Sequence, residues 1–322
     1  MIVLGLTTSL DMDNNVKKIV ITGGSGFIGS ELIKTLLEKG YQVVNLDLSP
    51  PRQKQENVIF VQVDLTNREQ VEEVLREQKA DAIIHLAGKN LFGRWNKKIK
   101  ESIYQSRIVS TRNIVSALRK IEQKPQVLIS ASAVGLYGDR GEEELDESSP
   151  PSDDFLAHVC VDWEKEAREA EALGIRTVQV RTAPVLGYGG LLNKMLPIFK
   201  FGLGGPIGSG KQWFPWIHIR DIVGTYIFAL ENEKIHGPVN ACSPEQIKNK
   251  EFSKVLAKIL HRPAFLKAPK WALKLALNDL ADFIVASQKV SPKKLIEAGY
   301  QFHFPRLEEA LRDILKTTID DN

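Results

Sequence analysis

The segment that most constrains the fold is a glycine-rich turn at residues 22–29, Thr-Gly-Gly-Ser-Gly-Phe-Ile-Gly. A short apolar run at 18–21 precedes it and predicts a strand. In the run that follows, Ile28, Leu32 and Leu36 recur every four residues, which predicts an amphipathic helix. A strand, a glycine turn and a helix in this order form the context that a dinucleotide-binding fingerprint requires.

Each glycine of this turn has its own physical reason to be a glycine. Gly23 would make the tight turn, Gly26 would let the backbone approach a pyrophosphate, and Gly29 would let the helix pack closely on the strand. The next residues, Phe27 and Ile28, open the helix, where free N–H groups and the positive end of the helix dipole would face the phosphates. We therefore expect this turn to hold a dinucleotide.

Strands and helices alternate through the first half of the chain. Further strands are predicted at residues 42–46, 58–63, 82–86, 127–129 and 177–180, and long helices near 99–118 and 154–172. A capping-box pattern at 66–69 predicts the start of another helix. The alternation predicts an α/β protein with a Rossmann-like, doubly wound parallel sheet and helices on both faces.

An acidic residue at the end of the second predicted strand bears on the choice of cofactor. Asp47 lies eighteen residues after Gly29, where a carboxylate accepts the adenosine ribose hydroxyls and repels a 2′-phosphate. The sequence therefore leans to NAD among the NAD(P) cofactors. Arg52 is close enough to serve NADP instead, and Asp47 could also be a turn-forming residue before Pro50.

Other cofactor contacts are expected where later strands end. Asp64 and Leu65 would lie beside the adenine. Leu86, Ala87 and Gly88 would lie beneath the ribose and the nicotinamide. Plain core packing explains the apolar members of this set nearly as well.

The pattern changes after residue 181. Residues 187–210 are rich in glycine and predict a loop that wraps a site. We predict a loose tail at 1–16, an NAD(P)-binding Rossmann domain at 17–186, and at 187–322 the glycine-rich loop with a smaller, mostly helical C-terminal lobe on the substrate side.

Composition and charge argue against several classes of partner. The net charge is only +3, with acids and bases interspersed, so we expect neither a nucleic acid nor a membrane as a partner. The two cysteines, Cys160 and Cys242, are isolated and the six histidines are scattered, so we expect no metal site. No apolar run approaches the length of a membrane span, and the start of the chain lacks a basic signal-peptide region. These features favour a cytoplasmic protein.

Several motifs together resemble a known family. The matching segments lie at residues 22–29, 94–107, 130–138, 155–164, 202–210, 216–221, 262–263 and 287–292. They resemble the extended short-chain dehydrogenases/reductases, and more narrowly the atypical, sugar-nucleotide-epimerase-like branch called epimerase-family proteins, which end in a family-specific C-terminal domain. The resemblance implies a nicotinamide cofactor and places Arg107 and Pro184 on its nicotinamide side. It also implies that a homodimer could form through the two long helices.

The resemblance also shows which catalytic residues are missing. The superfamily uses a Tyr and a Lys four residues apart on one helix, with a Ser or Thr after the fifth strand, and the Lys lowers the pKa of the Tyr. Ser132 matches the hydroxyl position. Leu156 and Cys160, or Phe155 and Val159 one residue earlier, stand where the Tyr and the Lys are expected. Tyr137, Cys160 or water is left as the proton donor.

Arg107 stands where extended relatives often have Asn. Its guanidinium could bind a carboxylate or phosphate of a small anionic substrate with two hydrogen bonds. An ordinary surface ion pair with the nearby Glu101 is the alternative.

Three functions are consistent with these residues. The first is an NAD(P)-binding oxidoreductase-like enzyme with a remodelled active site, in which Ser132 polarises the substrate oxygen. The second is a non-catalytic NAD(P)-binding module that reports the cofactor's state to a partner. A true nucleotide-sugar epimerase is the weakest, because epimerisation needs the base that is missing.

Overall fold

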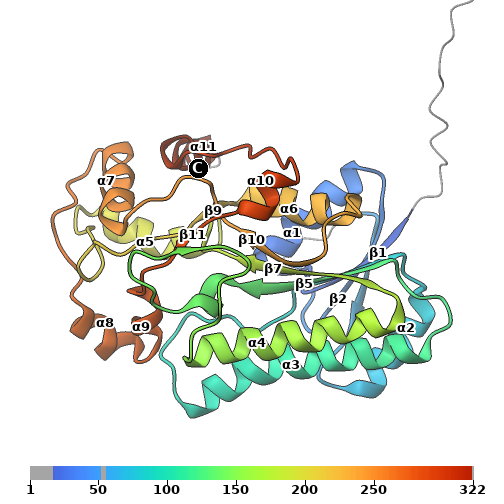
Figure 1. The fold of residues 1–322 in the computed structure, drawn as a ribbon. Coiled ribbons are helices and arrows are strands. Elements are labelled where there is room, and N and C mark those ends of the chain that lie inside the picture. The colour runs from blue at the N-terminus through green and yellow to red at the C-terminus, as the bar shows by residue number, and fades with distance from the viewer. Residues whose placement is uncertain (1–16, 52–55, 321–322) are drawn as a thin grey trace, which may run out of the picture.

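A seven-stranded parallel sheet forms the centre of the protein in the computed structural model, which describes residues 17–51 and 56–320 (Figure 1). The predicted tail at 1–16 and Arg52 lie outside the described residues. The strands, in spatial order, are β10 (Gly237–Ala241), β7 (Arg176–Thr182), β5 (Val127–Ala133), β4 (Ala82–His85), β1 (Lys18–Thr22), β2 (Gln42–Asp47) and β3 (Val58–Gln62). The predicted doubly wound parallel sheet is confirmed.

Helices cover both faces of this sheet. The first face carries α1 (Phe27–Glu38) and α6 (Ile219–Glu231), and the second carries α2 (Arg68–Gln78), α3 (Lys97–Lys120) and α4 (Phe155–Arg168) (Figure 1). Neighbouring residues of β1 point to opposite faces, so Ile19 and Ile21 pack toward α1 and α6 while Val20 packs toward α2 and α3. Both faces of the parallel sheet are therefore buried.

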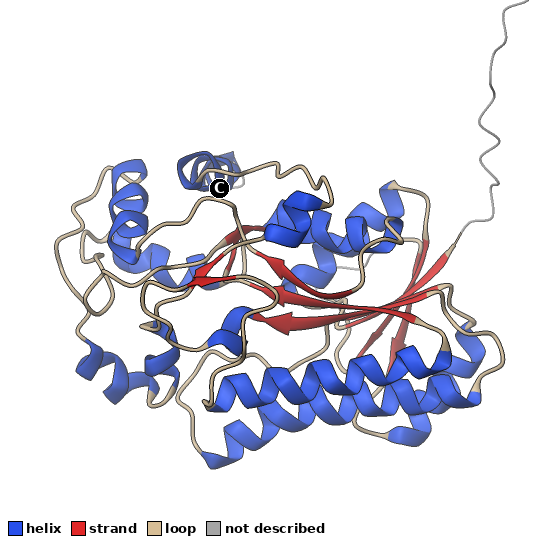
Figure 2. Ribbon diagram, in the orientation of Figure 1, coloured by secondary structure: helices blue, strands red, loops and turns tan. Residues whose placement is uncertain are grey.

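A mostly helical region gathers at the end of the sheet where the parallel strands terminate (Figure 2). It contains α5 (Leu191–Lys200), α7 (Asn249–Ile259), α8 (Lys270–Leu277), α9 (Leu280–Ile284), α10 (Lys293–Glu297) and α11 (Leu307–Asp320). Two small parallel pairs, β6 (Glu144–Leu145) with β11 (Lys289–Val290) and β8 (Val185–Leu186) with β9 (Ile217–His218), join it to the main sheet layer.

Among the strands that differ from the sequence prediction, two of the central sheet are the most informative. β5 extends through the small residues 130–133, because β7 pairs with it along that whole stretch. β10 was not predicted, because it contains glycine, proline and asparagine, which are uncommon in strands. An edge strand tolerates such residues. β10 and α6 belong to the sheet layer although they lie beyond residue 186, and the predicted domain boundary there remains a prediction.

The predicted capping box at residues 66–69 is wrong in register by one residue. Asn67 is the N-cap of α2 and accepts a hydrogen bond from the Gln70 amide. Thr66 instead donates its hydroxyl hydrogen to Asp64 at 2.7 Å. An asparagine satisfies a helix N-terminus as well as a threonine does, so the local sequence did not decide between them.

Candidate functional site

The glycine turn is packed so tightly that side chains do not fit in it. Gly23 has a φ of +74°, and an added Cβ there would lie 2.7 Å from the Ala87 nitrogen. At Gly29 a Cβ would lie 2.4 Å from the Gly23 carbonyl oxygen. The Gly26 amide donates to that same carbonyl at 3.1 Å and closes the turn. The turn therefore brings the ends of β1 and β4 and the start of α1 together.

This meeting point is also where the strand order reverses. The chain proceeds from β1 to β2 and β3 on one side, and from β4 to β5 and β7 on the other. A parallel sheet opens a crevice at such a switch point, beyond the carboxyl ends of its strands. The start of α1 has no side-chain cap, so its first N–H groups are left for a ligand.

Asp47 lies beside the glycine turn at the end of β2. Its carboxylate accepts a hydrogen bond from the Ser25 amide at 3.1 Å. The Ser25 hydroxyl in turn donates to the Ser49 carbonyl at 2.9 Å. Asn45, which the sequence analysis missed, donates to Ser25 at 3.2 Å from a buried position. The signal for Asn45 was a lone amide inside an otherwise apolar strand.

Asp64 and Leu65 follow β3, two strands away from the switch point. The Asp64 carboxylate accepts hydrogen bonds from the amide and hydroxyl of Thr66 and holds a turn. Leu65 is buried, and its carbonyl accepts from Asn113 at 3.0 Å. Both residues have structural partners, and their contact with an adenine stays a prediction.

A buried histidine holds the ends of β1 and β4 together next to the glycine turn. His85 is fully buried at the end of β4, with its Nδ1 2.6 Å from Thr22 Oγ1 and its Nε2 3.0 Å from Thr111 Oγ1. It thereby ties β1, β4 and α3 together below residues 86–88. Burial lowers the pKa of His85 to about 3, and the charge of Arg107 adds to this.

The low pKa of His85 predicts a pH-dependent stability. The folded chain holds this imidazole neutral, while the unfolded chain protonates it near pH 6.5. Between these values the unfolded state binds more protons, so the contribution is fully present above pH 6.5 and is lost as the pH falls. The free energy of unfolding should drop by about 1.4 kcal/mol per pH unit from this residue.

Urea unfolding at pH 7, 6 and 5 would measure this slope. His85→Gln should remove the part of the slope that His85 contributes. A residual slope should remain from His218, because burial lowers the pKa of that residue to about 3 as well. An unchanged slope in His85→Gln would contradict the assignment.

Arg107 is a half-buried cation, and no carboxylate partner for it is found in the described ranges. Its guanidinium donates to the carbonyls of Lys89 at 3.0 Å and Ile103 at 3.3 Å, and it lies 5.1 Å from the centroid of the Trp163 ring. Burial lowers the pKa of Arg107 to about 10, which still leaves it protonated at neutral pH. Within the described ranges no ion pair joins it to Glu101, so the surface ion pair weighed from the sequence is wrong.

The same guanidinium lies beside Gly88, just after β4, and near the position of the missing lysine. A Cβ added at Gly88 would lie 3.1 Å from the Arg107 guanidinium carbon. Cys160 is fully buried; burial, helped by Glu164, raises the pKa of its thiol to about 12, and the positive charge of Arg107 opposes this. Leu156 lies one turn earlier in an apolar cluster with Ile103 and Trp163. The cation near this position therefore comes from α3 and not from α4.

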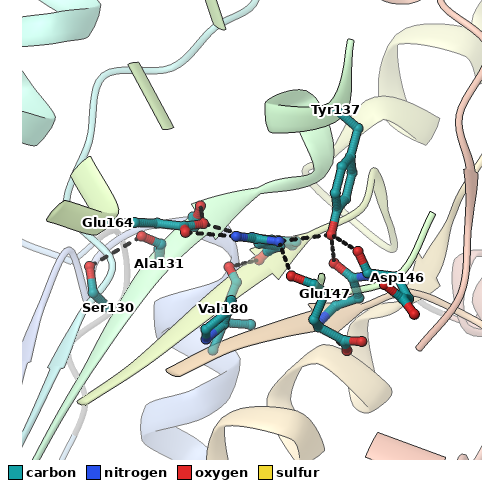
Figure 3. A network of polar contacts seen from close by, with 12 residues as sticks. Ser130, Ala131, Tyr137, Asp146, Glu147, Glu164 and Val180 are labelled. Atoms are coloured by element: carbon teal, nitrogen blue, oxygen red, sulfur yellow. Dashed lines mark hydrogen bonds and ion pairs between the residues drawn. The ribbon is translucent and has the colours of Figure 1, made fainter. Parts of the chain in front are cut away.

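Ser132 belongs to a buried polar network that also contains Glu164 and Tyr137. Figure 3 shows Glu164 and Tyr137 in this network. Its hydroxyl donates to the Glu164 carboxylate at 2.7 Å. Glu164 also accepts two hydrogen bonds from Arg181, at 2.8 and 2.9 Å, in a bidentate ion pair. Burial lowers the pKa of Arg181, but the Glu164 carboxylate outweighs it and holds that pKa above its ordinary value.

Tyr137 closes the other end of this network. It lies in the short 3₁₀ helix η1 (Val134–Tyr137) and is fully buried. Its hydroxyl lies 2.7 Å from Asn240 Oδ1 and 2.9 Å from the Asp146 carbonyl, and it accepts a hydrogen bond from Arg181 (Figure 3). Burial raises the pKa of Tyr137 to about 12. The structure thus gives Ser132 and Tyr137 internal partners, and their catalytic roles stay predictions.

The glycine-rich loop leads into a structural anchor. Pro184 follows β7 at the carboxyl edge of the sheet, and its carbonyl accepts from the Ile217 amide. His218 caps α6, as its position before the helix suggests. Asp221 is buried and accepts from the amides of His303 at 2.7 Å and Phe304 at 3.0 Å. These contacts fix the last part of the chain to the sheet layer.

Residues 17–51 and 56–320 contain no cluster of three or more His, Cys, Asp or Glu side chains able to hold a metal ion. No helix in these ranges has both the length and the apolar character needed to cross a membrane.

Comparison with protein families gives two matches along the chain. Residues 19–242 match the model of the NAD dependent epimerase/dehydratase family. Residues 268–314 match a second model, a domain of unknown function called DUF1731. The second match spans α8 to α11, so the C-terminal helices form a recurring unit.

Similar proteins match nearly the whole chain. Epimerase family protein YfhF of Bacillus subtilis is 41% identical over 298 residues, which cover 92% of this chain and 97% of that protein. The chloroplastic SDR39U1 homolog of Arabidopsis thaliana is 36% identical and covers 92% of this chain and 86% of its own length. The crystal structure of human epimerase family protein SDR39U1 with NADPH superposes with a TM-score of 0.82 at 33% identity, covering 93% and 99% of the two chains.

Proposed function

This chain belongs to the NAD dependent epimerase/dehydratase family, as its motifs suggested, and from that premise we propose that it is an NAD(P)-binding oxidoreductase with a remodelled active site. Its substrate would be a small molecule with an anionic group. The observation that carries the proposal is Arg107, a half-buried cation beside Gly88 for which no carboxylate partner is found in the described chain.

The glycine turn and Asp47 at the switch point have the features that would hold a dinucleotide. A Cβ at Gly23 or Gly29 would meet backbone atoms, so these glycines keep the turn tight and the start of α1 close to the ends of β1 and β4. A pyrophosphate would bind at that helix start, near Gly26. Asp47 has a carboxylate available to ribose hydroxyls next to the turn, which favours NAD over NADP. When bound, the nicotinamide ring would accept or donate a hydride. Cytoplasmic location and a homodimer remain predictions.

The proposed role of Arg107 is to supply the positive charge that a lysine supplies elsewhere in the superfamily. A guanidinium presents a planar fork of N–H donors that matches a carboxylate or a phosphate. Its present partners are two backbone carbonyls, which an anion can replace at little cost. A low local dielectric would strengthen that contact.

The proton route is proposed to involve water and not a side chain of α4. The Ser132 hydroxyl already donates to Glu164, and the thiol of Cys160 is buried with its pKa raised to about 12. Ser132 could then receive a hydrogen bond from a substrate hydroxyl but would not donate one to a carbonyl. This differs from the polarising role expected from the sequence.

A screen of NADH and NADPH oxidation with carbonyl compounds and nucleotide sugars tests the proposal. Activity should be confined to substrates with a carboxylate or phosphate, and Arg107→Gln should lower kcat/KM by about 100-fold, as expected for a lost charged contact. Arg119→Gln is the matched control, because Arg119 lies on the same helix in an exposed pair with Glu169. Inactivity across both panels would contradict the proposal.

A non-catalytic NAD(P)-binding module is the second candidate function. It is favoured by the internal partners of Ser132 and Tyr137, which leave neither hydroxyl hydrogen free for a substrate. A cofactor that binds yet stays chemically unchanged after long incubation would support it. Loss of a partner protein on substitution of Asp47 or Gly26 would complete the case.

A further inference from the structure

Two segments of the chain contain basic residues but no acidic ones. Residues 182–220 and 252–278 hold ten of the 43 lysines and arginines and none of the 40 aspartates and glutamates. This leaves 33 basic and 40 acidic residues for the rest of the chain. The small net charge therefore conceals a strong separation of charge along the sequence.

The fold brings these two segments together at one end of the molecule. Arg262 Nε donates to the Lys200 carbonyl at 2.9 Å. The amide of Gly208 donates to the Ala268 carbonyl at 2.8 Å, and the Ala268 amide donates to the Pro206 carbonyl at 3.1 Å. α5 and α8, one from each segment, lie at the same end of the protein (Figure 1).

Large apolar side chains are exposed on this surface. α8 buries none of its residues, and Trp271 and Leu275, which share one face at i and i+4, are 73% and 72% exposed. We define the basic apolar patch by its six exposed apolar residues, which are Phe201, Leu203, Phe265, Leu266, Trp271 and Leu275. Exposed apolar residues gathered in this way mark an interaction surface.

Only some of the charges around the patch have ion-pair partners in the described protein. Lys270 and Lys274 both pair with Asp282. For Lys200 and Lys267 no ion pair is found within the described ranges. A two-fold contact between two copies would set this positive surface against itself, which disfavours a second copy as the occupant. The patch therefore fits an anionic partner.

The apolar side chains distinguish among anionic partners. Nucleic acids use basic residues for phosphates and aromatic rings for bases, but they offer no buried environment for Leu203, Leu266 and Leu275. The interface of a bilayer accepts both tryptophan and leucine, with lysines facing its headgroups. Anionic lipids attract basic residues that lie near the surface.

We propose that the basic apolar patch binds the surface of a membrane that contains anionic lipids, with α8 lying in the plane of the interface. This is peripheral binding, distinct from membrane spanning. It goes beyond the proposed oxidoreductase and does not depend on it. The small net charge and the interspersed acids and bases led us to expect no membrane partner. The fold changes this expectation because it joins two segments that contain basic residues and no acidic ones.

Co-sedimentation of the full chain with lipid vesicles tests this proposal. We expect binding to vesicles of phosphatidylcholine with about one-third phosphatidylglycerol, weak binding to phosphatidylcholine alone, and loss of binding at high salt. Trp271→Glu with Leu275→Glu should weaken the partition by about tenfold or more. Ile296→Glu is the matched control, because Ile296 is 51% exposed on α10, outside the patch.

Three results would overturn the proposal. They are absence of vesicle binding at low salt, equal binding by the double variant, and equally tight binding to a DNA duplex with the same sensitivity to both substitutions. Circular dichroism and the melting temperature of each variant would verify folding, and both substituted side chains are exposed enough for folding to persist. Cofactor binding should be the same in all variants, so failure here leaves the oxidoreductase proposal separately testable.

Discussion

Arg181→Met is expected to lower the free energy of unfolding by about 3–5 kcal/mol, because it leaves a buried carboxylate without its partner. Glu164 and Arg181 are 3% and 7% exposed at their side chains and share a bidentate ion pair. Arg181 also donates to Tyr137 and to the Glu147 carbonyl, at 2.9 and 3.1 Å. Its removal therefore uncouples α4, β7 and the segment around Tyr137 together. Urea unfolding followed by circular dichroism would measure the loss.

The double variant Glu164→Met with Arg181→Met distinguishes two causes of destabilisation. One is an unpaired buried charge, and the other is the loss of side-chain packing. Replacing both charges with apolar side chains of similar length should recover most of the loss, because no buried charge is left unpaired. The matched control is Arg112→Met, whose partner Glu166 lies on the same helix as Glu164 but in an exposed pair. A cost below about 1 kcal/mol for Arg181→Met would contradict the role of the network, since exposed pairs contribute no more than that.

Gly29→Ala is expected to weaken cofactor binding by about tenfold or more. Moving the turn to make room for the added methyl group should cost about 1–3 kcal/mol of binding free energy, and about 1.4 kcal/mol corresponds to a tenfold change in affinity. The added Cβ would lie 2.4 Å from the Gly23 carbonyl oxygen and 2.6 Å from the Gly24 Cα, and both are backbone atoms that cannot rotate away. The turn must move away from α1. Isothermal titration calorimetry with NADH and NADPH would measure the change.

A second glycine variant controls for the loss of stability. At Gly224 in α6 an added Cβ would lie 2.3 Å from the Tyr300 hydroxyl, far along the sequence from the glycine turn. Gly224→Ala should destabilise the protein but preserve the cofactor affinity. If Gly29→Ala bound NADH and NADPH as tightly as the unsubstituted protein, the turn would not be the phosphate site.

The sheet could be predicted because its signals are local. Apolar runs such as residues 42–46 and 82–86 follow glycine or polar breaks, and the helices between them keep a regular period. Strand β10 could not be predicted, because its Gly-Pro-Val-Asn-Ala sequence forms a strand only by pairing with β7. The cap of α2 at Asn67 shows the same limit at the scale of one residue.

Some residues of the candidate site could also be predicted from the sequence, and others could not. The glycine turn and Asp47 could be predicted from their spacing in the sequence. The absence of the Tyr–Lys pair could be seen by comparing the sequence with the motifs of the short-chain dehydrogenases/reductases. The buried pair of Glu164 and Arg181 was not, because seventeen residues and a change of element separate the two. His85 was missed as well, since a histidine that ends an apolar strand has no sequence pattern that announces its threonine partners.

Fluorescence titration of the protein with NADH and with NADPH tests the central claim most directly. We predict saturable binding with a dissociation constant below about 100 μM for NADH, in the range in which enzymes commonly bind substrates. Asp47→Ala should weaken NADH binding and reduce the preference of the protein for NADH over NADPH. The control is Asp81→Ala, whose carboxylate accepts from the Lys18 amide at the opposite edge of the sheet. Absence of saturable binding of either nucleotide to the folded protein would contradict the account.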